Sequence, residues 1–285
     1  MSAFRDAQNH RRIATFAALD ARADTYRMEP LVVTLTLATP IAIGRPFDIA
    51  LDGILAHTLL HQAFEGDLTC LPPPETNPLF LRLPLTLQGP APHQATAWHW
   101  GRALTPAEMQ TSWWYACSTT ELVDVVARDT HYWNKRFDTK FADVLDPSTK
   151  TVVTEKGHYK AYHQPLPVIT CRAVRWHVVG DRTAITALLD LVEYIGKKRA
   201  YGEAAILQRT VTPEPIDHSL YRADGGLARP VPLRALPEMG LTDWGHDAWA
   251  TPPSRLYVAY RAPQWLSVNQ AECAWGGIRH AAQVA

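Results

Sequence analysis

Hydrophobic and polar residues alternate in the segment LVVTLTLA, residues 31–38. A period of two residues is typical of a β-strand that buries one of its faces. The segment therefore predicts a strand whose core face consists of Leu31, Val33, Leu35 and Leu37.

A helical period follows in FDIALDGILAHTLLHQAFE, residues 47–65. The apolar residues Leu51, Ile54, Leu55 and Leu59 form the stripe of an amphipathic helix. Asp48 is suited to be the N-cap, because its carboxylate can accept a hydrogen bond from a free backbone amide. Gly53 costs about 1 kcal/mol relative to alanine inside a helix, so we expect it to allow close packing against the first strand.

The same two periods return in the second half of the chain. CRAVRWHVVG, residues 171–180, alternates as a strand, and DRTAITALLDLVEYIG, residues 181–196, has helical spacing through Ile195. Asp181 or Thr183 is the expected N-cap, and Gly196 is the expected residue just after the helix. Strand alternation resumes in AAILQRTVT, residues 204–212.

The remaining segments carry weaker patterns. Residues 79–89 and 94–104 predict a hairpin around GPAPH, whereas residues 105–118 fit either a helix or a strand. The C-terminal third is proline-rich, and we expect it to be irregular with one strand, RLYVAY at 255–260. Residues 1–29 are interpreted as an N-terminal extension, helical or partly disordered, before a domain at 30–285.

The order of the expected elements is strand, helix, strands, an insertion, strand, helix, strand. This is the split β-α-β order of ferredoxin-like and RRM-type domains, so the pattern predicts an α+β fold. The insertion, at about 129–163, mixes cations with aromatic residues and is expected to be irregular with short strand-like pieces.

The composition of the chain favours some classes of function and argues against others. Lys and Arg number 28 and so do Asp and Glu, which argues against a free-standing nucleic-acid binder and leaves only local basic patches. The 10 tryptophans favour contact surfaces for partners. The four cysteines form no CxxC pair, so we expect buried free thiols in a reducing cytoplasm, with no zinc site and no disulfide framework. No apolar run is long enough to span a membrane.

The most basic loop is GKKRAYG, residues 196–202, between the helix expected at 181–196 and the strand expected at 204–212. It is not a phosphate-binding P-loop, because such a loop precedes a helix and uses its N-terminus. Two interpretations remain level: cations that complement a helix C-terminus, or an RNA contact in which cations bind phosphates and a tyrosine stacks on a base. The candidate RNA-binding residues are Gly196, Lys197, Lys198, Arg199, Tyr201 and Gly202.

The insertion also has two interpretations. It is either a solvated loop of mixed charge or an arm that contacts nucleic acid, since cations and aromatic residues alternate as single-strand binding requires. Its candidate RNA-binding residues are Lys135, Arg136, Lys140, Lys156, Tyr159 and Lys160.

Catalytic motifs are scarce. His158, Tyr159 and Lys160 could support metal-independent cleavage of RNA by acid–base chemistry, but the chain has no GxSxG or HExxH motif. Asp48, Asp52, His57 and His61 could suggest a metal site, yet capping and solvation explain them better. We therefore expect no metal, no cofactor and no catalytic residue.

Several of these stretches together resemble the RAMP proteins of CRISPR systems. IGKKRAYGEAAI (195–206) stands where that family carries its glycine-rich loop, and FDIALDGILAH (47–57) is similar to the first helix of the Cas family-five-like subunit of type IV effectors. KGHYKAYHQPL (156–166), AVRWHVVGD (173–181), RPVPL (229–233) and YRAPQW (260–265) are similar to it as well. The loop departs from the family at Glu203 and Ala204, where a closing glycine is usual.

The resemblance implies a RAMP fold with a thumb at 129–163 and a non-catalytic role. Such a subunit caps the 5′ handle of the guide RNA (crRNA) in a cytoplasmic ribonucleoprotein. Its partners would be a backbone subunit, a large-subunit-like protein and, through the complex, target DNA. Two alternatives stay open: an endoribonuclease that processes guide precursors, and an interaction protein whose tryptophans bind partners without RNA.

Overall fold

The protein is described here from a computed structural model. The structure describes residues 2–43, 49–69, 71, 81–90, 111–135, 162–197, 199–241, 249–262, 264 and 266–279. Its helices are α1 (Ser2–Ala23), α2 (Leu51–Ala63) and α6 (Arg182–Leu189). Its strands are β1 (Met28–Leu37), β2 (Ile41–Ala42), β3 (Leu87–Gln88), β4 (Trp114–Tyr115), β5 (Glu121–Lys135), β6 (Tyr162–Asp181), β7 (Ile206–Pro213), β8 (Leu227–Pro232), β9 (Trp249–Thr251), β10 (Ser254–Ala259), β11 (Gln270–Gly276) and β12 (Ile278–Arg279).

The main sheet is antiparallel and has β1 near its centre. β1 pairs with β6 on one side and with β7 on the other, and β5 pairs with the far side of β6. Leu31, Val33 and Leu35 are fully buried and the residues between them are partly exposed, which confirms the predicted strand. The fold is a mixed α/β arrangement, as the two hydrophobic periods predicted.

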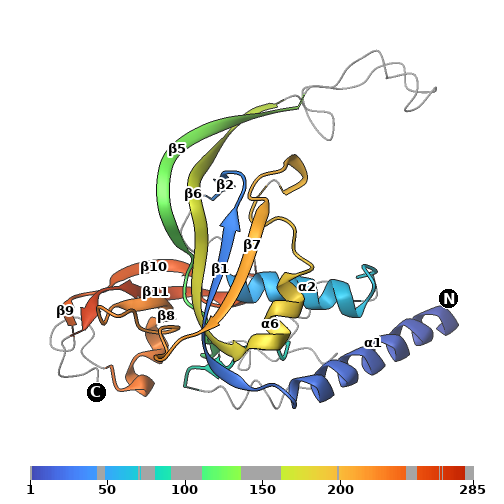
Figure 1. The fold of residues 1–285 in the computed structure, drawn as a ribbon. Coiled ribbons are helices and arrows are strands. Elements are labelled where there is room, and N and C mark those ends of the chain that lie inside the picture. Colours follow the sequence, from blue (N-terminus) through green and yellow to red (C-terminus); the bar gives the residue numbers. More distant parts are fainter. Residues whose placement is uncertain are drawn as a thin grey trace.

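Helices α2 and α6 cover the same face of this sheet and pack against each other (Figure 1). Leu51, Leu55 and Leu59 of α2 join Ile185 and Leu188 of α6 in one hydrophobic core with the inward residues of the strands. Each leucine or isoleucine fully buried in this way contributes about 1.5–3 kcal/mol. β2 pairs with β6 as well, and the chain order through the sheet is β1, β2, α2, β5, β6, α6, β7.

Helix α6 begins where the sequence predicted and ends earlier. Asp181 is its N-cap, since its Oδ1 accepts a hydrogen bond from the amide of Ala184 at 2.8 Å. The predicted extension to residue 195 is wrong, because Arg209 of β7 donates hydrogen bonds to the carbonyls of Leu189 and Val192 and ends the helix there. Residues 190–191 form a turn, and Tyr194 then pairs with Ala205 in a β-bridge, so Val192 and Ile195 are buried outside the helix.

Two expectations for α2 change. The helix starts at Leu51 with Ala50 as its N-cap, and Asp48 lies outside the described residues. A side-chain carbon on Gly53 would come within 3.0 Å of the Gln264 side chain, so the glycine accommodates the C-terminal part of the chain and not the first strand.

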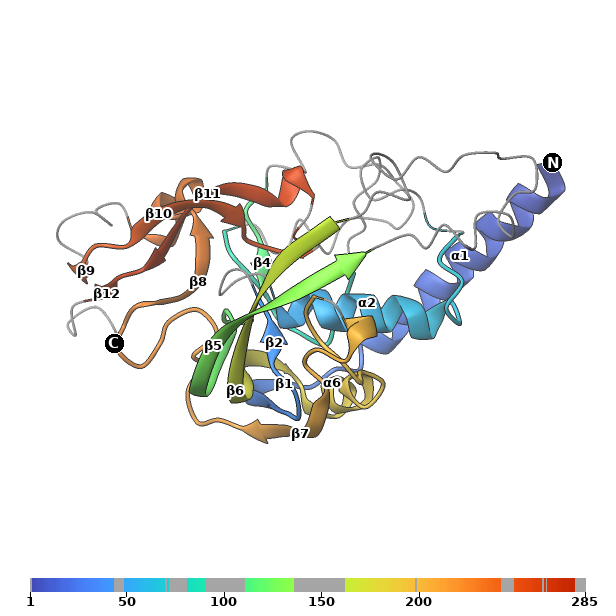
Figure 2. The ribbon, with the colours of Figure 1, turned by 90° about the horizontal axis from the view of Figure 1, so that it is seen from above.

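The C-terminal third is more regular than its prolines suggested. Strands β8, β10 and β11 form an antiparallel sheet in the order β10-β11-β8, and β9 pairs with β12 (Figure 2). All six residues of β8, LARPVP, are buried. β8 lies at the sheet edge, where proline is tolerated because an outward amide is not needed. The expectation of an irregular region with a single strand is therefore wrong.

The expected insertion is partly strand. β5 and β6 stay paired from Ala127↔Thr170 to Lys135↔Tyr162, and this ribbon, the β5–β6 arm, projects beyond the main sheet (Figure 1). Its register shifts between Val125 and Ala127, at the base of the arm. Residues 136–161 lie outside the described residues.

Smaller expectations have mixed outcomes. β3 pairs with β4, so residues 105–118 contain a strand, and the expected partner at 94–104 lies outside the described residues. Cys117, Cys171 and Cys273 are free and buried, as expected, whereas Cys70 is not described. None of the described helices has both the length and the apolar character that crossing a membrane requires.

One buried arginine joins the C-terminal sheet (β8, β10 and β11) to the part of the chain that precedes it. Arg229 of β8 is only 5% exposed and donates hydrogen bonds to the carbonyls of Tyr115, Cys117 and Tyr260, at 2.8 Å for Cys117. Burial raises the pKa of the nearby Asp52 carboxyl, and the positive charge of Arg229 partly offsets that rise. Asp52 in turn accepts a hydrogen bond from the Gln264 side chain at 3.3 Å.

We predict that Arg229→Met lowers the free energy of unfolding by about 3–5 kcal/mol, because it leaves a buried carboxyl without its counter-charge and three carbonyls without their donor. Urea denaturation measures the loss. Arg255→Met is the control: Arg255 lies exposed on neighbouring β10 in an ion pair with Glu272, and its loss costs less than about 1 kcal/mol. Equal losses in the two variants would contradict a joining role for Arg229.

Candidate nucleic-acid interface

The glycine-flanked loop, residues 196–202, is held in a defined shape. Gly196 and Gly202 have φ of +76° and +82°, a region that favours glycine. A side-chain carbon on Gly196 would lie 3.0 Å from Ile49 and 3.3 Å from the Ala42 carbonyl, so packing requires glycine there as well. The Thr39 hydroxyl donates to the Gly202 carbonyl at 2.7 Å and accepts from the Ala205 amide at 2.9 Å.

The structure removes one interpretation of the loop cations. Helix α6 ends at Leu189, so Lys197 and Arg199 lie well beyond its last turn, where the helix dipole has faded. Lys197 and Arg199 are exposed, and the Tyr201 side chain is 63% exposed on the short 3₁₀ turn Arg199–Tyr201. Lys198 lies outside the described residues. The cations therefore do not cap the helix and are available to solvent.

The loop touches the β5–β6 arm. Glu203 accepts a hydrogen bond from His131 Nδ1 at 2.8 Å, and the rings of Trp133 and Tyr201 meet edge to face at 5.7 Å. The two candidate regions, far apart in sequence, are thus neighbours. On the arm itself Tyr132 stacks on His163, with ring centroids 4.6 Å apart.

Most of the predicted arm residues are not placed. Lys135 ends β5 and only its backbone is described. The others, and the possible nuclease residue His158, lie outside the described residues: Arg136, Lys140, Lys156, Tyr159 and Lys160.

Glu203 and Ala204, the two departures from the family loop, have local roles. The Glu203 side chain is only 13% exposed and binds His131 of the arm. Its negative charge is therefore directed at the arm and away from the exposed cations of the loop. Ala204 is fully buried with a φ of +51°, and its amide donates to the Pro40 carbonyl at 2.9 Å. The alanine therefore keeps a left-handed conformation in which glycine is usual.

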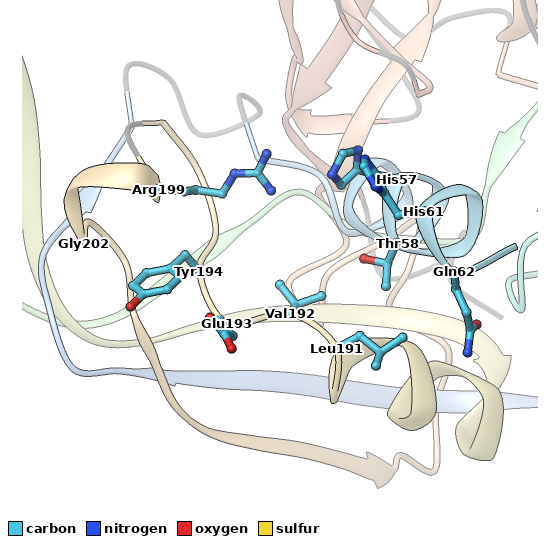
Figure 3. Close-up of a pocket in the computed structure, with 10 residues that line it drawn as sticks. All are labelled: His57, Thr58, His61, Gln62, Leu191, Val192, Glu193, Tyr194, Arg199 and Gly202. Carbon is cyan, nitrogen blue, oxygen red and sulfur yellow. The ribbon is translucent and has the colours of Figure 1, made fainter. Parts of the chain in front are cut away.

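A pocket of about 680 Å³ opens between α2 and the segment from Leu191 to Gly202 (Figure 3). His57 and His61 line its α2 side, one helical turn apart, with ring centroids at 4.2 Å. Arg199 extends toward them from the loop. Val192 and Leu191 add an apolar wall, so the pocket combines three groups that can carry positive charge with apolar surface.

These histidines are the site residues that sequence reasoning missed. It grouped them with Asp52, but Asp52 is buried near the N-terminus of α2 against Gln264 and does not line this pocket. Their i, i+4 spacing did place them on one helix face. What the sequence could not supply is Arg199, which reaches the same space from a loop more than a hundred residues later.

The charges in the pocket act on one another. Burial lowers the pKa of His57, and the nearby His61 and Arg199 lower it further because they disfavour another positive charge. All three effects favour the neutral form of the His57 ring. Across the described part of the chain, no group of three or more His, Cys, Asp and Glu side chains could hold a metal ion.

We predict that Ala204→Val destabilises the fold by about 3 kcal/mol, because a β-branched residue is strained at this φ and overfills a buried site. Thermal or urea unfolding measures the change. Gly202→Ala is the matched control: it has a similar φ, but nothing lies within 4 Å of the added carbon, so only about 1 kcal/mol of backbone strain is expected. If Ala204→Val costs no more than Gly202→Ala, the tight closure of the loop at Ala204 is wrong.

Comparison with known families gives an identity for the chain. A comparison with curated proteins found no match. The sequence model of the family described as CRISPR type IV associated protein Csf3 matches residues 29–223 of the 285 residues. That match covers β1 through β7, including α2, the arm, the loop and the pocket. The chain therefore belongs to the Csf3 family of type IV CRISPR-associated proteins.

Proposed function

We propose that this chain is a non-catalytic subunit of a type IV CRISPR ribonucleoprotein that binds the 5′ handle of the guide RNA. The observation that carries the proposal is the Trp133–Tyr201 contact, which sets the aromatic residues of the arm beside the loop that carries the exposed cations Lys197 and Arg199. Cations that track phosphates beside rings on which bases stack are the parts of a single-strand binding surface.

We infer that the domain has a ferredoxin-like, RRM-type RAMP fold in which the β5–β6 arm is the base of a thumb. The strand order β5-β6-β1-β7, antiparallel throughout, supports this, as do α2 between β1 and β5 and α6 between β6 and β7. In this proposal the arm reaches toward a backbone subunit, and a large-subunit-like protein and target DNA join through the complex.

The open face of the sheet is not the proposed RNA surface. RRM domains stack bases on aromatic residues of that face. Here two neighbouring cross-strand rows of that face contain no Phe, Tyr or Trp: Thr210, Thr34 and Arg175, and Gln208, Thr36 and Ala173. Trp176 is fully buried on the helix side. Base stacking is therefore assigned to the loop and the arm.

No described residue favours the nuclease alternative, since His158, Tyr159 and Lys160 all lie outside the described part of the chain. We therefore keep a single proposed function.

We predict that replacing Lys197, Lys198 and Arg199 with alanine weakens binding of guide RNA. Three lost phosphate contacts reduce the slope of log affinity against log salt by about 2 for a single strand. Fluorescence anisotropy with labelled repeat RNA over a salt series measures both quantities.

The matched control removes three exposed cations elsewhere, Arg172, Arg182 and Arg255. It should leave both affinity and slope nearly unchanged. Equal affinity and equal slope in the wild type and the loop variant would show that the loop does not hold RNA.

A further inference from the structure

The pocket between α2 and the glycine-flanked loop has one strongly basic end. His57 and His61 of α2 and Arg199 of the loop converge there (Figure 3). In the part of the chain that the structure describes, no carboxylate forms an ion pair with any of these three side chains. The pocket therefore brings together three groups that can carry positive charge, and none of them is paired with a carboxylate of the described residues.

We propose that this pocket is a binding site for one phosphate group of a nucleic-acid strand, held by Arg199 together with His57 and His61. The inference rests on the proposed function and adds a ligand site to it. A guanidinium presents paired donors that match phosphate oxygens, and imidazolium adds two more donors from the opposite wall. The pocket has the size of sites that hold a small ligand, so a nucleotide around that phosphate fits as well.

A metal ion fits this site poorly. Two histidines at i, i+4 are a common pair of metal ligands, but Arg199 lies close enough to lower the pKa of His57 by its charge. The same positive charge that disfavours a proton on His57 disfavours a cation between the rings. An anion reverses the sign of every one of these interactions.

Binding of a phosphate should therefore be linked to uptake of protons. Burial, His61 and Arg199 lower the pKa of His57. A phosphate beside the ring favours the charged imidazolium and raises that pKa, so affinity must rise as the pH falls through the histidine range.

The other charged groups around α2 do not replace this pair. Glu193 and Tyr194 line the pocket, and in Figure 3 the Glu193 carboxylate lies away from the histidines. Lys197 is exposed on the loop and does not line the pocket. At the ends of α2, Arg11 pairs with Glu65 and Asp67, and Asp52 is buried near Arg229.

The test measures binding of a short single-stranded repeat RNA, labelled at its 3′ end, by the full chain between about pH 6 and pH 8. For the wild type we expect tighter binding at the lower pH, by up to about tenfold for each histidine whose pKa rises one unit. The His57→Gln/His61→Gln variant should bind with little dependence on pH. His218→Gln is the control, because His218 lies beyond the end of β7 against Glu214 and should not alter the dependence.

A wild-type affinity that does not change with pH, a dependence that persists in the double variant, or one that is equally lost in His218→Gln overturns the phosphate site. Each of these leaves the proposed function standing, because RNA is still bound. No binding of RNA at any pH overturns the proposed function itself. The same RNA with a 5′-hydroxyl or a 5′-phosphate then identifies the source: equal affinity assigns the site to an internal phosphodiester, and tighter binding of the 5′-phosphate assigns it to the terminus.

NMR of the wild-type chain gives a second readout that needs no variant to fold. The imidazole signals of His57 and His61 are titrated with and without inorganic phosphate. Raised pKa values for these two histidines, with His218 unchanged, support the site. Unchanged values for both overturn it.

Discussion

The guanidinium of Arg229, buried among three backbone carbonyls, fixes how the two parts of this protein meet. It joins β8 of the C-terminal sheet to the chain around β4 and to the end of β10. Its charge also makes a buried Asp52 tolerable near the start of α2, where Gln264 completes the contact. A charge removed from water needs hydrogen bonds and a counter-charge. Here the carbonyls of Tyr115 and Cys117 accept hydrogen bonds from Arg229, and Arg229 supplies the positive charge near Asp52. The helix that carries the pocket histidines is thereby anchored by residues outside the 29–223 family match.

Much of the main sheet could be predicted from the sequence, because its strands bury one face and show it as alternation. The N-cap at Asp181 could also be predicted, because its carboxylate accepts a hydrogen bond from an amide only three residues later, that of Ala184. The end of α6 was not local. Apolar spacing continues through Ile195, but two contacts with residues later in the chain hold this segment outside the helix: Arg209 binds the Leu189 and Val192 carbonyls, and Tyr194 pairs with Ala205. β8 was missed for a different reason: a strand buried on both faces shows no alternation, and its prolines resembled a loop.

The candidate site could be predicted only in pieces. Residue types identified the loop and the insertion separately, but their contact depends on pairs such as His131 and Glu203, 72 positions apart. The acid that appeared to weaken the loop is instead directed at the arm. The sequence alone favours solvated histidines on α2, because Arg199, which faces them across the pocket, is far away in the sequence.

The register shift at the base of the β5–β6 arm has a mechanical consequence. Such an irregularity disrupts the ladder of hydrogen bonds locally, and a bulge of this kind bends its strand and increases the twist. Beyond that point the described arm touches the glycine-flanked loop and its neighbour Glu203 through Trp133 and His131. The position of the described arm is therefore tied by these two contacts to Tyr201 and Glu203, close in sequence to Arg199 and Gly202 of the pocket lining.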